Sequence, residues 1–395
     1  MNRATRVLVF CVAVLLGLGM ITLYSSSMNL ELRRSTVAVG SDFLRSQMVW
    51  GVFGVVGCAV AAAVDYRRWK KIAPWILGFA VLLLILVFVP HIGWAAKAGN
   101  DGGGASGAHR WVGLPYLPRS PHFQASELAK LTVILFLAAY AERYQRQMGT
   151  LKYGLVIPIT ILVIPLALIF REPDRGCTIL LALVAGAMLI VAGVRLFYLV
   201  PPFLLAAGGL AFSFIHDPMR LKRILAWLHP ELSKDDAGYQ AYQAMIAFGS
   251  GGWTGLGLGD SRQKMGFVPE HHNDFIFAII GEELGLVATL AVVVLFVTVM
   301  FCGISIARQA TDTFGRLLAT GITFMISLQA FINMGVATSL LPNKGMPLPF
   351  ISYGGSNLLL MLVSIGLLLS ISRFSAEPAL VKSDPFDVPQ KLSDE

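Results

Sequence analysis

The sequence predicts an all-α integral membrane protein with about ten transmembrane helices. Of the 395 residues, 56% are hydrophobic and only 14% are charged, whereas an ordinary soluble domain is roughly 25% charged. The apolar residues form stretches close to the length of about 20 residues that a helix needs to cross a hydrocarbon core. Because lipid offers no hydrogen bonds to the backbone, such stretches must be helical. All seven tryptophans lie near the ends of these stretches or between them, as interfacial anchors do.

Ten apolar spans follow one another along the chain. We expect them at residues 7–26, 46–64, 72–90, 125–141, 154–170, 177–194, 196–215, 274–304, 316–337 and 351–372. The first follows Arg3 and Arg6 and could be taken for a signal peptide. Its apolar run, however, exceeds the roughly 7–15 residues of a signal core, and no A-x-A cleavage site follows it. We therefore interpret this span as a retained membrane anchor.

Two long connections and a polar tail lie outside the spans. The first connection, 91–122, opens with the glycine-rich stretch 98–107, which we expect to be flexible. The second, 216–273, lies between the seventh and eighth spans and is predicted to be a large extracytoplasmic loop. We interpret 1–373 as a single polytopic membrane domain and 374–395 as a disordered cytoplasmic tail. No internal repeat is visible, so an inverted-repeat transporter is not indicated.

The net charge of +8 does not indicate a nucleic-acid-binding protein, because the basic residues are spread over many membrane loops. The short connection carrying Arg67, Arg68, Lys70 and Lys71 is expected to be cytoplasmic by the positive-inside rule. With this orientation the outer side holds about as many lysines and arginines as the cytoplasmic side, so charge alone does not fix the topology. The four cysteines have no paired spacing, and neither a disulfide framework nor a zinc site is indicated.

Asp274 is the leading candidate for chemistry. It lies in Pro269–Phe275 (PEHHNDF), at the mouth of the eighth span. A carboxylate at this depth costs several kcal/mol unless it is hydrated or paired, which makes it a functional candidate. From position alone, capping of the helix is an equally good interpretation. The neighbouring His271 and His272 point in different directions on a helix and lack a further ligand motif, so a metal site is not indicated.

Four further charged residues lie inside predicted spans. Glu282 is about 12 Å further into the eighth span than Asp274 and about 80° around the helix, and Glu283 points nearly opposite to Asp274, so neither can share a proton with it. We expect both glutamates to pair with cations or polar groups of neighbouring helices. Glu127 and Lys130, three residues apart, are close enough to pair. The plain interpretation is an interfacial pair whose lysine snorkels.

Three loop features complete the candidates. Asp174 lies between the fifth and sixth spans and is expected to be a turn or cap residue. The run Gly249–Gly259 (GSGGWTGLGLG) lacks the lysine and spacing of a nucleotide loop, so we expect tight backbone packing, with close approach to a ligand as the alternative. Leu341–Phe350 holds three prolines and predicts a rigid outer-edge hairpin whose one charge is Lys344.

These residues belong to a set of separated motifs. They are Tyr24–Ser27 (YSSS), Gly107–Trp111 (GAHRW), Gln124–Glu127 (QASE) with Lys130, Pro173–Asp174 with Gly176, Gly249–Gly252 (GSGG) with Gln263–Lys264, Pro269–Glu270, His272 with Asp274–Phe277 (DFIF), Gly281–Glu283 (GEE), Leu341–Pro342 with Lys344–Gly345, and Pro347–Ser356 (PLPFISYGGS). Through these motifs the chain resembles the SEDS family (shape, elongation, division and sporulation), whose members include FtsW and RodA. The resemblance covers nearly the whole membrane part of the chain.

The resemblance implies a peptidoglycan glycosyltransferase that joins lipid II, an undecaprenyl-pyrophosphate-linked disaccharide-peptide, to the 4-hydroxyl of another. The family's essential acid falls on Asp274, which becomes the general base of an inverting transfer. Cations would hold the departing pyrophosphate, and would also explain the charge on the outer side. For this role we expect Arg110, Lys130, Arg220, Arg223, Lys264 and Lys344. Supporting roles are expected for Glu127, Asp174, His272, Glu282, Glu283, Ser352 and Ser356.

The resemblance also implies partners and a location. A class B penicillin-binding protein would supply the peptide cross-linking, together with other membrane proteins of the divisome or elongasome. The chain would lie in the bacterial cytoplasmic (inner) membrane with its active site on the extracytoplasmic face. The motifs require no cofactor, although a divalent cation, Mg²⁺ or Mn²⁺, assisting the pyrophosphate is left open. The LPNKG stretch around Lys344 resembles the FtsW branch more than the RodA branch, which favours septal over lateral wall synthesis.

The chain departs from the family pattern at three places. An extra PRSPH stretch precedes Gln124, Asn273 stands where threonine is usual, and Arg175 stands where leucine is usual. None of these changes removes the expected base. Two other functions stay open beside the glycosyltransferase: a lipid II flippase, indicated by the charges inside the spans, and a non-catalytic divisome scaffold.

Overall fold

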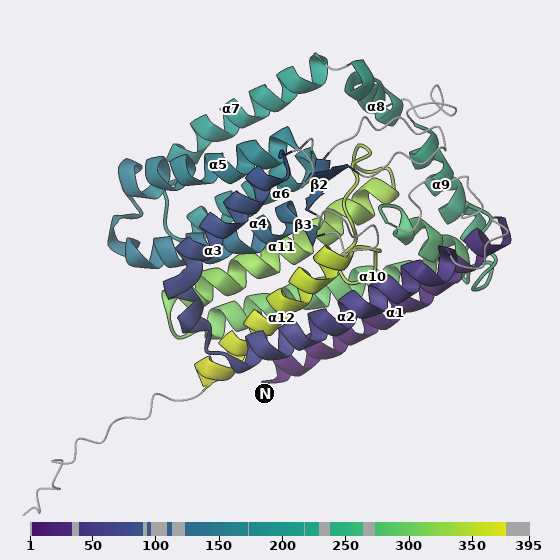
Figure 1. The fold of residues 1–395 in the computed structure, drawn as a ribbon, viewed down its shortest axis with the longest axis horizontal. Helices are drawn as coiled ribbons and strands as arrows, with labels where there is room; N and C mark the ends of the chain where they lie inside the picture. The colour runs from purple at the N-terminus through teal and green to yellow at the C-terminus, as the bar shows by residue number, and fades with distance from the viewer. Residues whose placement is uncertain are drawn as a thin grey trace, which may run out of the picture.

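The protein is a bundle of long helices with two short helices and a small sheet at one end (Figure 1). The structure, a computed structural model, describes residues 2–33, 39–89, 93–95, 109–112, 123–172, 174–216, 218–228, 238–263 and 273–376. The helices are α1 (Arg3–Arg33), α2 (Val39–Ala63), α3 (Tyr66–Leu86), α4 (Ala125–Arg143), α5 (Ile157–Arg171), α6 (Arg175–Val191), α7 (Leu196–Ile215), α8 (Pro218–Leu228), α9 (Tyr239–Gly251), α10 (Ile276–Gln309), α11 (Thr313–Ala337) and α12 (Gly355–Ala376). A 3-10 turn, Gln145–Gln147, and a π-helical turn, Lys152–Val156, join α4 to α5.

Each of the ten expected spans coincides with one helix, so the all-α membrane fold is confirmed. Within the described residues, eight helices are long and apolar enough to cross a membrane by themselves: α1, α2, α3, α5 with its π turn, α7, α10, α11 and α12. The other two expected spans are α6, which has 17 residues, and α4, which carries four charged residues. The number of ten crossings therefore stays a prediction.

α4 and α11 lie in the interior of the bundle. α4 packs against α3, α11 and α6, and it is buried along nearly its whole length. α11 also packs against α10 and α6, while α12 packs along α2 and α1 along α10. In contrast, none of the apolar stretch of α7 is buried, and α7 lies at the outer edge of the bundle in Figure 1. Glu127 and Lys130 of α4 are thus enclosed by protein and do not face lipid.

A three-stranded antiparallel sheet was not expected from the sequence. It is formed by β1 (Gly93–Ala95), β2 (His109–Val112) and β3 (Phe123–Gln124), in the order β1-β2-β3. Trp111 pairs with Trp94 on one side and with Gln124 on the other. The sheet thus leads the chain directly into the N-terminus of α4. The stretch 98–107, for which we expected flexibility, lies outside the described residues.

One expected boundary needs correction, and the long connection contains two helices. α12 continues to Ala376, so the tail does not begin at residue 374, and 377–395 lie outside the described residues. The connection 216–273 is partly helical, because it contains α8 and α9. α8 is amphipathic in sequence, with Arg220, Lys222 and Arg223 among leucines, which suits a helix at a membrane surface.

Candidate functional site

Asp274 lies just before α10, where backbone contacts to two other segments hold it. The N-cap residue of α10 is Phe275, so Asp274 does not occupy the cap position that we considered. The carbonyl of Asp274 accepts a hydrogen bond from Asn333 Nδ2 at 2.9 Å. The preceding carbonyl, of Asn273, accepts one from Ser352 Oγ at 2.6 Å. The aspartate is half-buried and is fixed to α11 and to the connection between α11 and α12.

The connection between α11 and α12 is the predicted proline-rich hairpin, and it lies directly against Asp274. A Cβ atom added to Gly345 would lie 2.3 Å from Asp274 Oδ2, so only glycine leaves room for the carboxylate there. The hairpin turns through Phe350, whose φ is +67°, and Ser352 Oγ accepts a hydrogen bond from Leu348 N at 2.7 Å. The side chain of Ser352 therefore locks the hairpin and holds the Asp274 segment at the same time.

Lys344 is the one charged residue of this hairpin. It is half-buried, next to Gly345 in the chain, and burial lowers its pKa to about 8. The charge of Asp174 opposes this shift and that of Arg175 adds to it, which places Lys344 near the N-terminus of α6. Asp174 is the N-cap of that helix, since its Oδ1 accepts a hydrogen bond from Cys177 N at 3.1 Å. The expectation that Asp174 is a cap residue is confirmed.

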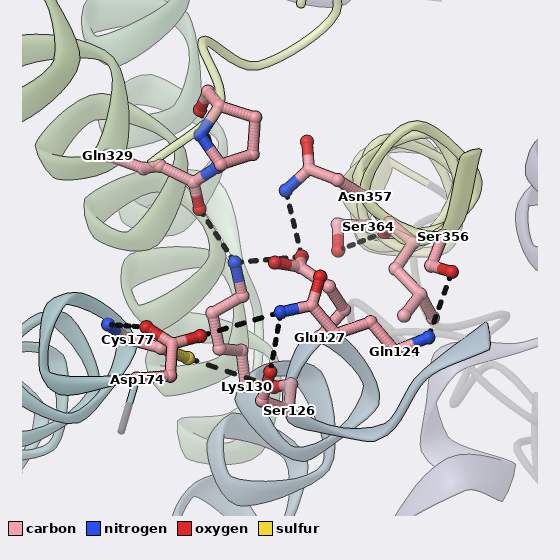
Figure 2. Close-up of polar contacts among 12 residues, drawn as sticks. Gln124, Ser126, Glu127, Lys130, Asp174, Cys177, Gln329, Ser356, Asn357 and Ser364 are labelled. Atoms are coloured by element: carbon pink, nitrogen blue, oxygen red, sulfur yellow. Dashed lines mark hydrogen bonds and ion pairs between the residues drawn. The ribbon is translucent and has the colours of Figure 1, made fainter. Parts of the chain in front are cut away.

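A buried ion pair lies deeper in the bundle, between α4, α11 and α12 (Figure 2). Lys130 Nζ lies 2.8 Å from Glu127 Oε2, and the two side chains are only 4% and 5% exposed. Lys130 also donates to Gln329 Oε1 at 2.7 Å, and Glu127 Oε2 accepts from Asn357 Nδ2 at 2.8 Å. The pairing is confirmed, but the lysine does not snorkel, because α11 and α12 provide its surroundings.

Gln124 connects this region to the cap of α6. Its Nε2 donates to Ser126 Oγ at 3.1 Å and to Asp174 Oδ2 at 3.4 Å, as Figure 2 shows. Its backbone N–H donates to Ser356 Oγ at 3.0 Å. Ser356, which we expected in a supporting role, thus fixes the point where β3 becomes α4.

The glycine-rich run after α9 packs against α10 and breaks it. Gly285 has a φ of +76°, and a bend divides α10 at this residue. The N–H groups of Leu256 and Gly257 donate to the carbonyls of Glu282 (2.9 Å) and Glu283 (3.0 Å). A Cβ atom on Gly255 would lie 2.1 Å from the Glu283 carbonyl. Tight backbone packing, as expected from the sequence, is therefore the role of these glycines in this structure.

The side chains of Glu282 and Glu283 hold different segments to α10. The Glu283 carboxylate accepts from Ser25 Oγ on α1, which lies 2.7 Å from each oxygen. The Glu282 carboxylate accepts from three donors of the loop that follows the glycine-rich run. These are Ser261 Oγ, Arg262 N at 3.0 Å and Gln263 N at 3.3 Å. The expected pairing with polar groups of neighbouring segments is confirmed.

The structure brings some of the expected site residues together and leaves others undescribed. Asp274, Lys344, Asp174 and Ser352 gather around the hairpin, with the Glu127–Lys130 pair beneath it. Lys264 and His272 lie outside the described residues. Arg110 belongs to β2, and Arg220 and Arg223 belong to α8, but their side chains also lie outside the described part.

The sequence reasoning assigned no role to three neutral amides that complete the site: Gln329, Asn333 and Asn357. Each is at most 5% exposed and lies in an apolar helix. A buried amide in such a helix is costly unless it is hydrogen-bonded, and this could have marked them.

No three His, Cys, Asp or Glu side chains within the described ranges converge to hold a metal ion.

Comparisons with known proteins agree with this architecture. The model of the FtsW, RodA and SpoVE family, described as cell cycle proteins, matches residues 6–377. A probable peptidoglycan glycosyltransferase FtsW of Geobacter metallireducens is 38% identical over 371 residues, 94% of this chain and 95% of the relative. A second relative with the same name, from Trichlorobacter lovleyi, is 37% identical over 366 residues, which cover 93% of this chain and 92% of the relative.

Solved structures show the same fold. A chain solved in work on the structural coordination of polymerization and crosslinking by a peptidoglycan synthase complex gives a TM-score of 0.70 at 26% identity, covering 94% of this chain and 98% of that one. The rod shape determining protein RodA of Thermus thermophilus gives a TM-score of 0.64 at 24% identity, covering 94% and 97%. With a family model that matches nearly its whole length, the chain belongs to the FtsW, RodA and SpoVE family of cell cycle proteins.

Proposed function

We propose that this protein is a peptidoglycan glycosyltransferase that polymerises lipid II, with Asp274 as its general base. Relatives 37–38% identical over more than 90% of the chain bear the name peptidoglycan glycosyltransferase FtsW, which supports the reaction class. The observation that carries the mechanism is the position of Asp274. Its carboxylate lies against Gly345, its carbonyl is bonded to Asn333 of α11, and the preceding carbonyl, of Asn273, is bonded to Ser352.

The reaction needs one base and one site for a leaving anion. The 4-hydroxyl oxygen of the acceptor sugar attacks the anomeric carbon of the donor, its proton passes to Asp274, and the bond from that carbon to the pyrophosphate oxygen breaks. The pyrophosphate departs with the bonding electrons and needs a cation beside it. Lys344, the neighbour of Gly345 in the chain, is our candidate for this cation among the described residues.

The partner and the location follow from the same proposal. The solved relative from a peptidoglycan synthase complex supports an association with a second, cross-linking enzyme, for which a class B penicillin-binding protein is the expected type. The apolar helices suit a multi-pass protein of the bacterial inner membrane, with the hairpin on the extracytoplasmic face. The FtsW names of the relatives favour the septal over the lateral role.

No described contact favours the alternative of a flippase. A translocation path for a charged headgroup needs charged side chains that face an open route. Glu127, Lys130, Glu282 and Glu283 are instead each buried and hydrogen-bonded to protein groups. A flippase therefore enters as an outcome of the test.

The test is polymerisation of lipid II by the purified protein, with and without its cross-linking partner and divalent cations. The wild-type protein should form glycan strands, and Asp274→Ala should form none while it remains folded. Reconstituted vesicles report translocation in parallel. A full polymerising activity in Asp274→Ala would overturn the mechanism, and translocation that depends on Glu282 but not on Asp274 would favour the flippase.

A further inference from the structure

Two buried amides lie one helical turn apart on α11, directly beneath the hairpin. Gln329 is 0% exposed and Asn333 is 1% exposed. Because residues four apart share one face of a helix, both side chains reach the same neighbouring segment. That segment is the backbone of Met346 and Pro347, immediately after Gly345.

Asn333 joins the segment of Asp274 to the hairpin. Its Nδ2 donates to the Asp274 carbonyl at 2.9 Å and to the Met346 carbonyl at 2.6 Å. Two carbonyl acceptors fix the orientation of the amide, because a turned amide would point its oxygen at both of them. One side chain therefore sets the distance between the backbone of Asp274 and the residue that follows Gly345.

Gln329 joins the same hairpin to the buried ion pair. Its Nε2 donates to the Pro347 carbonyl at 2.9 Å, and its Oε1 accepts from Lys130 Nζ at 2.7 Å. The chain of contacts thus runs from Glu127 through Lys130 and Gln329 to Pro347, as Figure 2 shows for its first members.

Stability alone does not explain Asn333. Its Oδ1 is buried and has no hydrogen-bond partner among the described residues. An unpaired buried acceptor is unfavourable, and an apolar side chain of similar size would avoid it. The hydrogen bonds that Asn333 does make, from Nδ2, both go to backbone carbonyls of the site.

We propose that Asn333 and Gln329 are positioning residues for the reaction, an inference that rests on Asp274 being its base. Asn333 sets the Asp274 carboxylate against the hairpin. Gln329 ties the hairpin to the Glu127–Lys130 pair, so that the pair influences turnover through the position of the hairpin.

Steady-state polymerisation of lipid II tests the proposal. Asn333→Leu keeps a side chain of similar volume and removes the Nδ2 hydrogen-bond donor. Because a small misplacement of a reacting group slows the chemical step, kcat should fall about 10- to 100-fold. The KM for lipid II should change by less than about 3-fold, since ground-state binding is untouched. Gln329→Glu keeps the acceptor for Lys130 but loses the donor to Pro347, and should also lower kcat selectively. Ser327→Ala is the control: Ser327 is buried on α11 and its Oγ has no partner among the described residues, so its kcat should equal that of wild type.

Hydrogen exchange of the 342–353 peptide supplies a readout that does not depend on activity. Exchange should quicken in Asn333→Leu and Gln329→Glu but not in Ser327→Ala, with all three variants remaining folded. Unchanged kcat or unchanged exchange in Asn333→Leu would overturn the role of Asn333, and the same result in Gln329→Glu would overturn the link to the ion pair. If Asp274→Ala remained active, the proposed function would fail separately, and the exchange data would still decide whether the amides hold the hairpin.

Discussion

The buried Glu127–Lys130 pair allows a quantitative prediction. Replacing Lys130 by methionine leaves the Glu127 carboxylate buried with Asn357 Nδ2 as its remaining described donor. Removing one partner of a buried pair costs about 3–5 kcal/mol. The shift in Tm is the change in the free energy of unfolding divided by the unfolding entropy. At about 2.1 cal/mol/K per residue over 395 residues, each kcal/mol lowers the Tm by about 1.2 °C. The Tm of Lys130→Met should therefore fall by about 4–6 °C.

The double variant Glu127→Gln, Lys130→Met separates burial of a charge from loss of packing. The neutral glutamine can still accept from Asn357, and no charge is left unpaired, so the Tm should return to within about 1–2 °C of wild type. The Lys70–Glu142 pair is the matched control, because its side chains are 42% and 22% exposed. Lys70→Met should cost at most about 1 kcal/mol.

Thermal unfolding of all four proteins in one detergent, followed by tryptophan fluorescence, is the measurement. If Lys130→Met shifted the Tm no more than Lys70→Met does, the pair would not be closed off from water. If the double variant were as unstable as the single one, the loss would come from packing and not from an unpaired charge. Either result would refute the reasoning.

Three further predictions concern the loops around the site. Gly255→Ala should destabilise the fold by about 2 kcal/mol or more in the same thermal unfolding assay, because its φ is +82° and the new Cβ would clash with the Glu283 carbonyl. Gly249→Ala is the control in the same run. Its new Cβ meets no atom within 4 Å, so the variant should be as stable as wild type. Lys344 should react with an amine-directed reagent with a midpoint near pH 8, read by mass spectrometry, and a midpoint above about 10 would contradict its burial. Because its pKa is lowered in the folded state, the folded protein should gain stability relative to Lys344→Met as the pH rises from about 8 to 10.5, and a loss over that window would have the wrong sign.

The helices and the buried glutamates could be predicted from the sequence because their signals are local. Each expected span coincides with a helix, because an apolar stretch of about 20 residues in a membrane protein is predicted to be helical from its hydropathy alone. Asp174 follows a turn and precedes an apolar run, which is the pattern of an N-cap, and it caps α6. Buried carboxylates in an apolar span need polar partners, and both Glu282 and Glu283 accept hydrogen bonds from neighbouring segments.

The remaining features depend on contacts between distant parts of the chain. The strands of the small sheet are too short to stand out, and their pairing joins Trp94 to Trp111. The break in α10 arises because the glycine-rich run supplies backbone partners at Gly285, within a span that reads as continuous. Asn333 reaches a carbonyl 59 residues away, so its role could not be read from its neighbours.

Lipid II polymerisation by Asp274→Asn tests the central claim most directly. Asparagine has the shape of aspartate, and the contacts from Asn333 and Ser352 are made to backbone carbonyls, so the site should keep its geometry. Only the ability to take a proton is lost, and general-base catalysis contributes roughly 10²–10⁴-fold. We predict a loss of that size with an unchanged Tm and an unchanged KM. Polymerisation at the wild-type rate would contradict the assignment of Asp274 as the base.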